Sequence, residues 1–237
     1  MNMGKRIGLH DKNELTKLLH LDVVLSAEVE SSIDNIDSYN SRVYNRVVNL
    51  YLVRNRLLRI EKIISNSKIL SNSIEMSMEK FVELQWSLYV VYINSYYDII
   101  LLLVNDVFSF GLNGNCVNDK TIVENNNIDN KLRNELKTLS HLISNENRFR
   151  VAKNKVAHQG IIDNHELMNS AWKQENIFRG RILGFTFKDL FVEHSQILEK
   201  KSFKKNLDEL KSKRIKLESI INEILDILAQ EFKIRDI

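Results

Sequence analysis

The chain has no proline, seven glycines and one cysteine among its 237 residues. At average usage a chain of this length would hold roughly a dozen prolines. Because β-sandwiches, β-barrels and α/β folds need many turns, and turns use glycine and proline, their scarcity argues against these folds. A single cysteine, Cys116, excludes an intramolecular disulfide and a cysteine-rich zinc site. The composition therefore predicts an all-α fold of a few long helices.

Common sequence signatures of enzymes are absent as well. The chain has no GxGxxG, GxxxxGK[ST], HExxH, GxSxG or CxxC motif. None of its six histidines pairs with another at the i, i+4 spacing of a helical metal site. We therefore expect neither a metal nor another cofactor.

Charge and hydropathy set further limits on partners and location. Lys and Arg exceed Asp and Glu by 34 to 31, a balance that permits a nucleic-acid partner without arguing for one. Residues 1–15 lack the apolar core of a signal peptide. The most apolar stretch, 88–112, contains Asp98 and Asp106, whereas a spanning helix needs about 20 mostly apolar residues. We expect a buried helix there, no membrane contact and a cytoplasmic location.

Two long helices are predicted in the first half of the chain. The first, which Ser32 or Asp34 can cap, ends at about Ser67 and has apolar residues at three-, four- and seven-residue steps. The second, which Ser73 can cap, ends at about Phe110. Its second half is apolar on nearly all sides, which is typical of a central helix.

A polar segment follows over residues 111–130, and Gly111 fits the C-terminal cap of the preceding helix. Asn125, Asn126 and Asn127 form its low-complexity centre. Loops beyond about 12–15 residues are often functional or disordered. Length and composition leave both interpretations open.

The remaining residues are predicted to be mostly helical and to end in one long helix. Helices are expected at about 129–143, 145–160, 165–173, 189–200 and 203–232, and residues 178–187 could be a short extended piece. The last helix has a 4-3 apolar repeat made of Phe203, Leu207, Leu210, Leu217, Ile221, Ile224 and Leu228. Arg214 interrupts this repeat at an inward position. The apolar face could pack in the chain's own bundle or form a coiled-coil dimer seam.

Two sets of side chains have alternative interpretations. The first helix carries Arg42, Arg46, Arg54, Arg56 and Arg59. The second helix carries Tyr89, Tyr92, Tyr96 and Tyr97. The arginines are either a solvated basic face or a stripe that faces RNA. The tyrosines either pack in the core or stack on bases.

Residues 148–160, RFRVAKNKVAHQG, form the candidate site. On a helix, Arg150, Asn154 and His158 lie at i, i+4 and i+8 and share one face, and Lys153 adds charge nearby. An imidazole can move the proton of a 2′-hydroxyl or of the leaving 5′-oxygen of RNA. A guanidinium or ammonium can neutralise charge that develops on the phosphate, and an amide can orient it. Alternatively, Asn154 and His158 only satisfy the end of a helix.

The run from Asn154 to His158, within KNKVAHQG, resembles the motif of the HEPN superfamily (higher eukaryotes and prokaryotes nucleotide-binding domains). That motif is Arg, a polar residue that is often Asn, a few further residues and His, with Arg and His separated by four to six positions. Asn154 matches the polar position and His158 the histidine. Lys153 stands at the arginine position, and the nearest arginine, Arg150, has seven residues between it and His158. Lysine keeps the charge but lacks the fork that holds phosphate bidentately.

The resemblance implies a fold and a domain organisation. It implies a HEPN-like bundle of about six α-helices over residues 34–200, with an N-terminal arm over residues 1–33. The C-terminal helix, 201–237, would pack on the bundle or on a dimer partner.

The resemblance also implies a function. Many members are homodimeric, metal-independent endoribonucleases, and we expect a protein of a bacterial toxin or antiphage defence system that binds or cleaves RNA. An antitoxin is then a candidate partner. In this interpretation His158 is the acid/base, Lys153 and Arg150 hold the phosphate, and Asn154 orients it. The alternatives are a non-catalytic helical interaction module and a nucleotide-binding accessory subunit of a nucleotidyltransferase.

Overall fold

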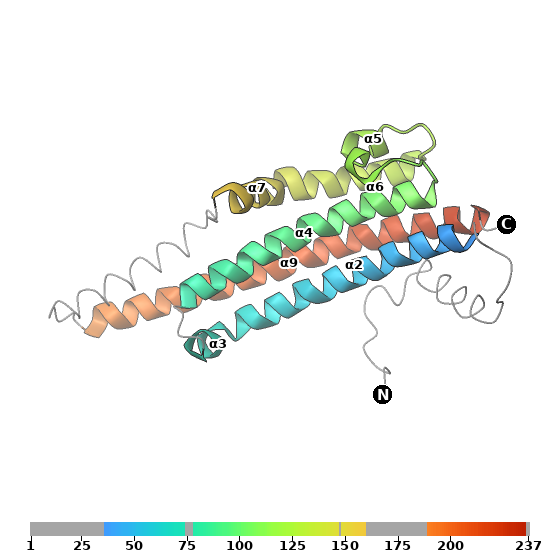
Figure 1. The fold of residues 1–237 in the computed structure, drawn as a ribbon. Coiled ribbons are helices and arrows are strands. Elements are labelled where there is room, and N and C mark those ends of the chain that lie inside the picture. The colour runs from blue at the N-terminus through green and yellow to red at the C-terminus, as the bar shows by residue number, and fades with distance from the viewer. Residues whose placement is uncertain (1–35, 74–77, 147, 160–188, 236–237) are drawn as a thin grey trace, which may run out of the picture. The chain divides into compact units, whose positions relative to one another are not determined.

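The architecture is known from a computed structural model (Figure 1). It describes residues 36–73, 78–146, 148–159 and 189–235. Within these ranges the regular elements are helices and no strand occurs, so the predicted all-α bundle with a long C-terminal helix is confirmed. The predictions for residues 1–33, 165–173 and 178–187 lie outside the described ranges.

Three long helices dominate the described fold: α2 (Ile36–Ser65), α4 (Met78–Val107) and α9 (Asp189–Arg235). The shorter helices are α3 (Ser67–Ser73), α5 (Asp119–Val123), α6 (Asn130–His141) and α7 (Phe149–Gln159). Two predicted boundaries were wrong. Ser73 ends the short helix α3, where we expected it to cap the next long helix. The two helices expected at 189–200 and 203–232 form one continuous helix, because no glycine or proline separates them.

The chain divides into two compact units, and the three long helices each contribute to both. Of the described residues, the first unit comprises 36–55, 93–146, 148 and 215–235. The second unit comprises the described residues within 56–92 and 149–214.

The core of the first unit is made of apolar faces at helical spacing. From α6 and the turn after it, Leu132, Leu136, Leu139 and Ile143 are at most 1% exposed, as their spacing predicts. From α9, the buried residues include Leu217, Ile221, Ile224 and Leu228. Fully burying a side chain of this size contributes about 1.5–3 kcal/mol, so these faces hold the helices of the unit together.

The end of α4 is capped by Ser109 and not, as predicted, by Gly111. The N–H of Ser109 donates to Asp106 O and the N–H of Phe110 donates to Asn105 O, both at 3.1 Å. These two bonds form a Schellman motif, whose left-handed residue is Ser109, with φ of 53°. Glycine usually takes this position because it has no Cβ to clash. Gly111 is also left-handed, with φ of 69°, but it lies two residues beyond the cap.

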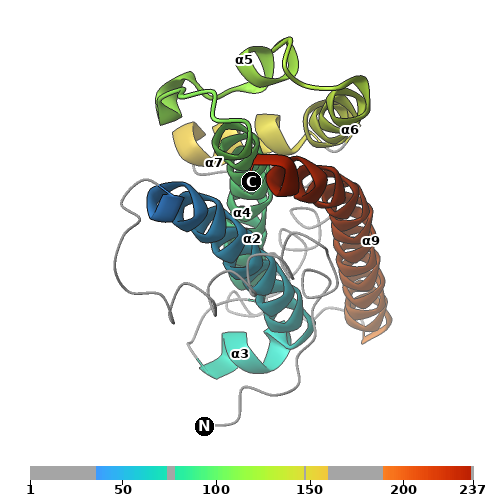
Figure 2. The same cartoon turned by 90° about the vertical axis from the view of Figure 1, so that its right-hand side faces the viewer.

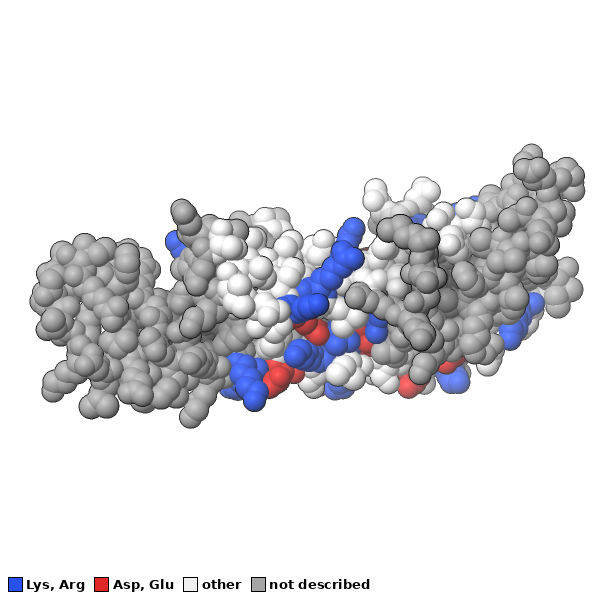
Figure 3. Space-filling view, turned by 90° about the horizontal axis from the view of Figure 1, so that it is seen from below, with Lys and Arg blue, Asp and Glu red and all other residues white. Residues whose placement is uncertain are grey.

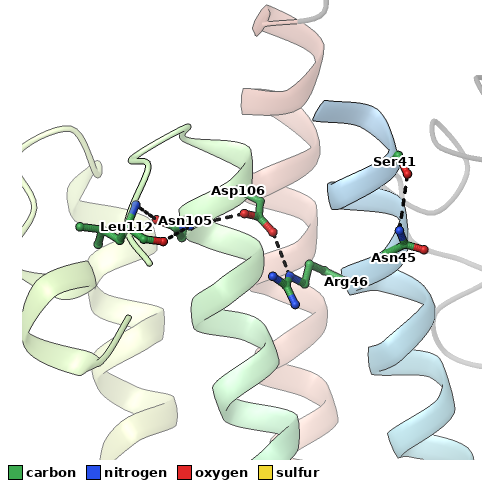
Figure 4. Close-up of polar contacts among 6 residues, drawn as sticks. All are labelled: Ser41, Asn45, Arg46, Asn105, Asp106 and Leu112. Atoms are coloured by element: carbon green, nitrogen blue, oxygen red, sulfur yellow. Dashed lines mark hydrogen bonds and ion pairs between the residues drawn. The ribbon is translucent and has the colours of Figure 1, made fainter. Parts of the chain in front are cut away.

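Asn105 joins this helix end to the chain that leaves it (Figure 4). Its Oδ1 accepts from the N–H of Leu112 at 3.1 Å, and its Nδ2 donates to Leu112 O at 3.3 Å. The neighbouring Asp106 forms an ion pair with Arg46 of α2, with Nε 2.9 Å from Oδ2. Asn105 and Asp106, two of the polar residues in the apolar stretch of α4, therefore bind its surroundings within the first unit.

Residues 111–130, predicted to be a functional or disordered loop, contain defined structure. Asn118 caps α5 in a reciprocal capping box with Thr121. Helix α5 lies beside α6 in the two ribbon views (Figures 1 and 2). Arg133 of α6 fixes the segment between them, because its guanidinium donates to the carbonyls of Val123, Asn125 and Ile128 at 3.0–3.1 Å.

The second unit contains a buried polar cluster made by α2, α4 and α9. Both carboxylate oxygens of Glu61 accept from Arg214, at 2.7 and 3.2 Å. The hydroxyl of Tyr89 is 3.3 Å from Glu61 Oε1 and 3.1 Å from Leu210 O. Arg214 therefore interrupts the apolar repeat because it has a buried partner. The neighbouring Leu207 and Leu210 are also buried, which confirms packing in the chain's own bundle and not as an exposed seam.

Helix α4 is buried on several sides, as predicted for a central helix. Tyr89, Tyr96 and Tyr97 are at most 1% exposed, so the core interpretation of these tyrosines is confirmed. By length and composition alone, 80–107 could cross a membrane, although 56% of its most apolar window is buried within the structure. The cytoplasmic location stays a prediction.

Candidate functional site

The candidate motif lies on α7, which runs without a break from Phe149 to Gln159. Arg148 precedes it with φ of 52°, a left-handed conformation that costs a non-glycine residue roughly 1–2 kcal/mol. The helix thus begins abruptly at Phe149. This confirms the predicted helix over residues 149–159, although its start is four residues later than the expected 145.

The helix places three of the four predicted residues as their spacing implies. Arg150 and Lys153 are half-buried, and Asn154 is exposed. His158 belongs to the last turn of α7, and its side chain lies outside the description. Because the backbone is helical throughout, Arg150, Asn154 and His158 follow one another at one-turn intervals, with Lys153 flanking this row.

The start of α7 is anchored in the second unit by Phe149. This side chain is 2% exposed, and the Nζ of Lys213 from α9 lies 5.8 Å from its ring centroid. A cation within about 6 Å of an aromatic face is attracted to it. Lys213 is itself paired with Glu209, one turn earlier on α9. A buried anchor directly before Arg150 fixes the helix that carries the motif.

The arginines of α2 do not form an uninterrupted solvated or RNA-facing stripe. Arg54 is 8% exposed and pairs with Glu218 at 3.1 Å, and Arg46 pairs with Asp106. Arg42, Arg56 and Arg59 are exposed. The face shown in Figure 3 accordingly carries acidic side chains among the basic ones. Sequence spacing missed this, because the partner carboxylates lie far along the chain.

The four tyrosines of α4 also differ from one another in burial. Tyr92 is only half-buried, unlike the other three, and the guanidinium carbon of Arg56 lies 5.2 Å from its ring centroid. This contact, within the second unit, is a cation–π pair that occupies one face of the ring.

No group of three or more His, Cys, Asp or Glu side chains that could hold a metal occurs in the part of the chain that the structure describes.

Comparison with protein-family models, with curated proteins and with solved structures finds no match to this chain.

Proposed function

We propose that the chain is an RNA-binding protein of the HEPN type that cleaves RNA without a metal ion. The observation that carries this proposal is the unbroken helix α7, which sets Arg150, Asn154 and His158 at one-turn intervals and leaves Asn154 exposed. The resemblance of residues 154–158 to the HEPN motif supplies the function. A bacterial toxin or antiphage setting, with an antitoxin as partner, belongs to the same proposal.

The proposed reaction is an attack of the RNA 2′-hydroxyl on the adjacent phosphorus. A base takes the 2′-hydroxyl proton, the bond from phosphorus to the 5′-oxygen breaks, and an acid protonates that oxygen. The products are a 2′,3′-cyclic phosphate and a 5′-hydroxyl. Lys153 and Arg150 neutralise charge on the phosphate, and Asn154 orients one of its oxygens.

Two copies of the chain complete this reaction better than one. The step needs a base and an acid, and α7 supplies one imidazole, His158. A two-fold contact, the commonest form of assembly, would bring a second His158 to the same phosphate. A homodimer is therefore part of the proposal.

The test is incubation of the full chain with structured and unstructured RNAs in excess EDTA. Wild type is expected to cleave, and His158→Ala is expected to be slower by at least about a hundredfold. His20→Ala, a histidine outside the motif, is the matched control and should cleave like wild type.

A second variant tests the position at which the sequence departs from the family motif. Lys153→Arg restores a bidentate phosphate grip and is expected to raise the cleavage rate by about tenfold. Lys131→Arg, an exposed lysine of α6, should leave the rate unchanged. If wild type and Lys153→Arg are both inert, the alternative of a non-catalytic interaction module replaces the enzyme.

A further inference from the structure

An open hollow of about 840 Å³ lies in the first unit, where α5, α6 and the π-helical turn Leu142–Glu146 meet. Small-molecule sites in proteins commonly have volumes of roughly 300–1,000 Å³. None of the residues that line the hollow belongs to α7, so nothing in the proposed RNA chemistry uses it.

One wall of the hollow contains an unsatisfied buried hydroxyl. Ser144 lines the hollow, and its Oγ is buried without a hydrogen-bond partner among the described atoms. Leaving such a group unsatisfied costs about 1–3 kcal/mol. Ser144 also lies in the π-helical turn. Single π-turns are rare in proteins as a whole, and those that occur are often found at functional sites. A ligand atom at this place would satisfy the hydroxyl.

The lysine and histidine side chains of the hollow, which can donate hydrogen bonds to an anion, come from two helices. Lys120 of α5 and Lys137 and His141 of α6 all line it and are exposed. The lining has two carboxylates, and one of them, Asp119, already accepts a hydrogen bond from Ser140 at 3.1 Å. Glu124 is the other. The lysines and the imidazole therefore leave the hollow suited to an anion.

Arg133 also lines the hollow, but its guanidinium binds the backbone of the segment between α5 and α6 and is not free for a ligand. Besides the three carbonyls that it binds, it donates to Asn130 Oδ1 at 3.0 Å, so most of its five N–H groups are engaged. A planar carboxylate is best held by an arginine fork, which this site does not offer. Separate lysines act as point charges and suit a tetrahedral phosphate.

We propose that this hollow binds a small ligand that bears a phosphate group. Lys120, Lys137 and His141 contact the phosphate, and the Ser144 hydroxyl bonds to a polar atom of the same ligand. The ligand is either free phosphate or a phosphate ester.

The experiment follows backbone amide shifts of the ¹⁵N-labelled full chain by NMR during titration with inorganic phosphate, ribose 5-phosphate or ribose. We expect saturation below about 10 mM for at least one of the two phosphate compounds, with shifts at 137–145, and no shifts with ribose. Tighter binding of ribose 5-phosphate assigns the site to an ester, and equal or weaker binding assigns it to free phosphate.

Three variants make the assignment specific. Lys137→Gln should weaken binding by at least about fivefold, whereas Lys131→Gln, on the same helix but outside the hollow, should not change it. Ser144→Ala should weaken binding of the preferred compound by about threefold without lowering the melting temperature, because the hydroxyl it removes has no partner in the free protein.

Several results would overturn the proposal. They are the absence of saturable shifts with both phosphate compounds, an equal loss of binding in Lys131→Gln, and a Ser144→Ala variant that melts at a lower temperature but binds normally. The last result would show that the hydroxyl serves the fold.

Discussion

Arg214 and Glu61 form a buried, two-pronged ion pair, with Nε 2.7 Å from Oε1 and Nη2 3.2 Å from Oε2. The side chains are 10% and 5% exposed. Arg214 comes from α9 and Glu61 from α2, so the residue that breaks the apolar repeat of the last helix makes a specific contact within the second unit. Replacing a pair of this kind with apolar residues is often neutral or stabilising, so we interpret it as fixing the register of the two helices.

Removing only the cation of this pair should be strongly destabilising. Arg214→Met is expected to lower the free energy of unfolding by about 3–5 kcal/mol, because the Glu61 carboxylate would remain buried without its cationic partner. The double variant Glu61→Leu with Arg214→Met should recover most of this loss. Urea denaturation followed by circular dichroism measures both.

The matched control is the exposed pair Lys216–Glu146, whose atoms approach to 2.8 Å at the surface of the first unit. Lys216→Met should change the free energy of unfolding by less than about 1 kcal/mol. If Arg214→Met proves as mild as Lys216→Met, the buried pair does not have the role given to it.

The cap of α4 leads to two predicted changes in stability, which have opposite signs. Ser109→Gly should stabilise the chain by about 0.5–1 kcal/mol, because glycine adopts the left-handed conformation without strain. Gly111→Ala should destabilise it by about 1 kcal/mol, although no atom lies within 4 Å of the added Cβ, because its φ of 69° is unfavourable for alanine. Thermal denaturation of the two variants checks both signs. A Ser109→Gly variant that melts at a lower temperature than wild type would contradict the assigned cap.

Apolar periodicity predicted which faces are buried, and much of the fold follows from it. The α6 face from Leu132 to Ile143 is an example, and the all-α fold class was predicted from the scarcity of glycine and proline. Periodicity cannot supply the partner of a buried charge. Arg214 was recognised as inward-facing, but Glu61 lies 153 positions away along the chain. The cap at Ser109 was missed for a related reason, since the hydrogen bonds that fix it override the local preference for glycine.

The candidate site also has features that the sequence predicted and features that it did not. Apolar and polar spacing predicted a helix that includes residues 149–159, and the backbone of α7 confirms it. The anchor of that helix, Phe149 against Lys213, depends on a contact between distant segments and has no sequence signal. The order in residues 111–130 depends on Arg133, a surface-helix arginine that composition alone does not distinguish from its neighbours.

Arg133 should therefore control the mobility of the segment it binds. Arg133→Met leaves the carbonyls of Val123, Asn125 and Ile128 without their donor and should speed amide hydrogen exchange over residues 122–128 by at least about tenfold. The control is Lys131→Met, on the same helix. If residues 122–128 exchange at the same rates in Arg133→Met and Lys131→Met, capping by Asn118 suffices to hold the segment.

Assembly is the fourth prediction. Because the proposed reaction uses both a base and an acid and α7 supplies one imidazole, the chain should be a homodimer at micromolar concentration, with both His158 side chains at one cleft. Light scattering measures the mass, and a cross-link between two copies of the His158→Cys variant, formed by a short bis-maleimide reagent that can span a cleft, tests the proximity. The variant should also carry Cys116→Ser, so that the introduced thiol is the only one in each chain. A monomer, or a dimer whose introduced cysteines do not cross-link, contradicts the prediction.

The most direct test of the proposed function is the mass of the RNA fragments released in excess EDTA. We predict fragments that end in a 2′,3′-cyclic phosphate, with partner fragments that begin with a 5′-hydroxyl, and we predict that both disappear in His158→Ala while its melting temperature stays near that of wild type. Fragments with 3′-hydroxyl and 5′-phosphate ends would contradict the account. So would an absence of fragments from wild type and Lys153→Arg together with a markedly lower melting temperature for His158→Ala.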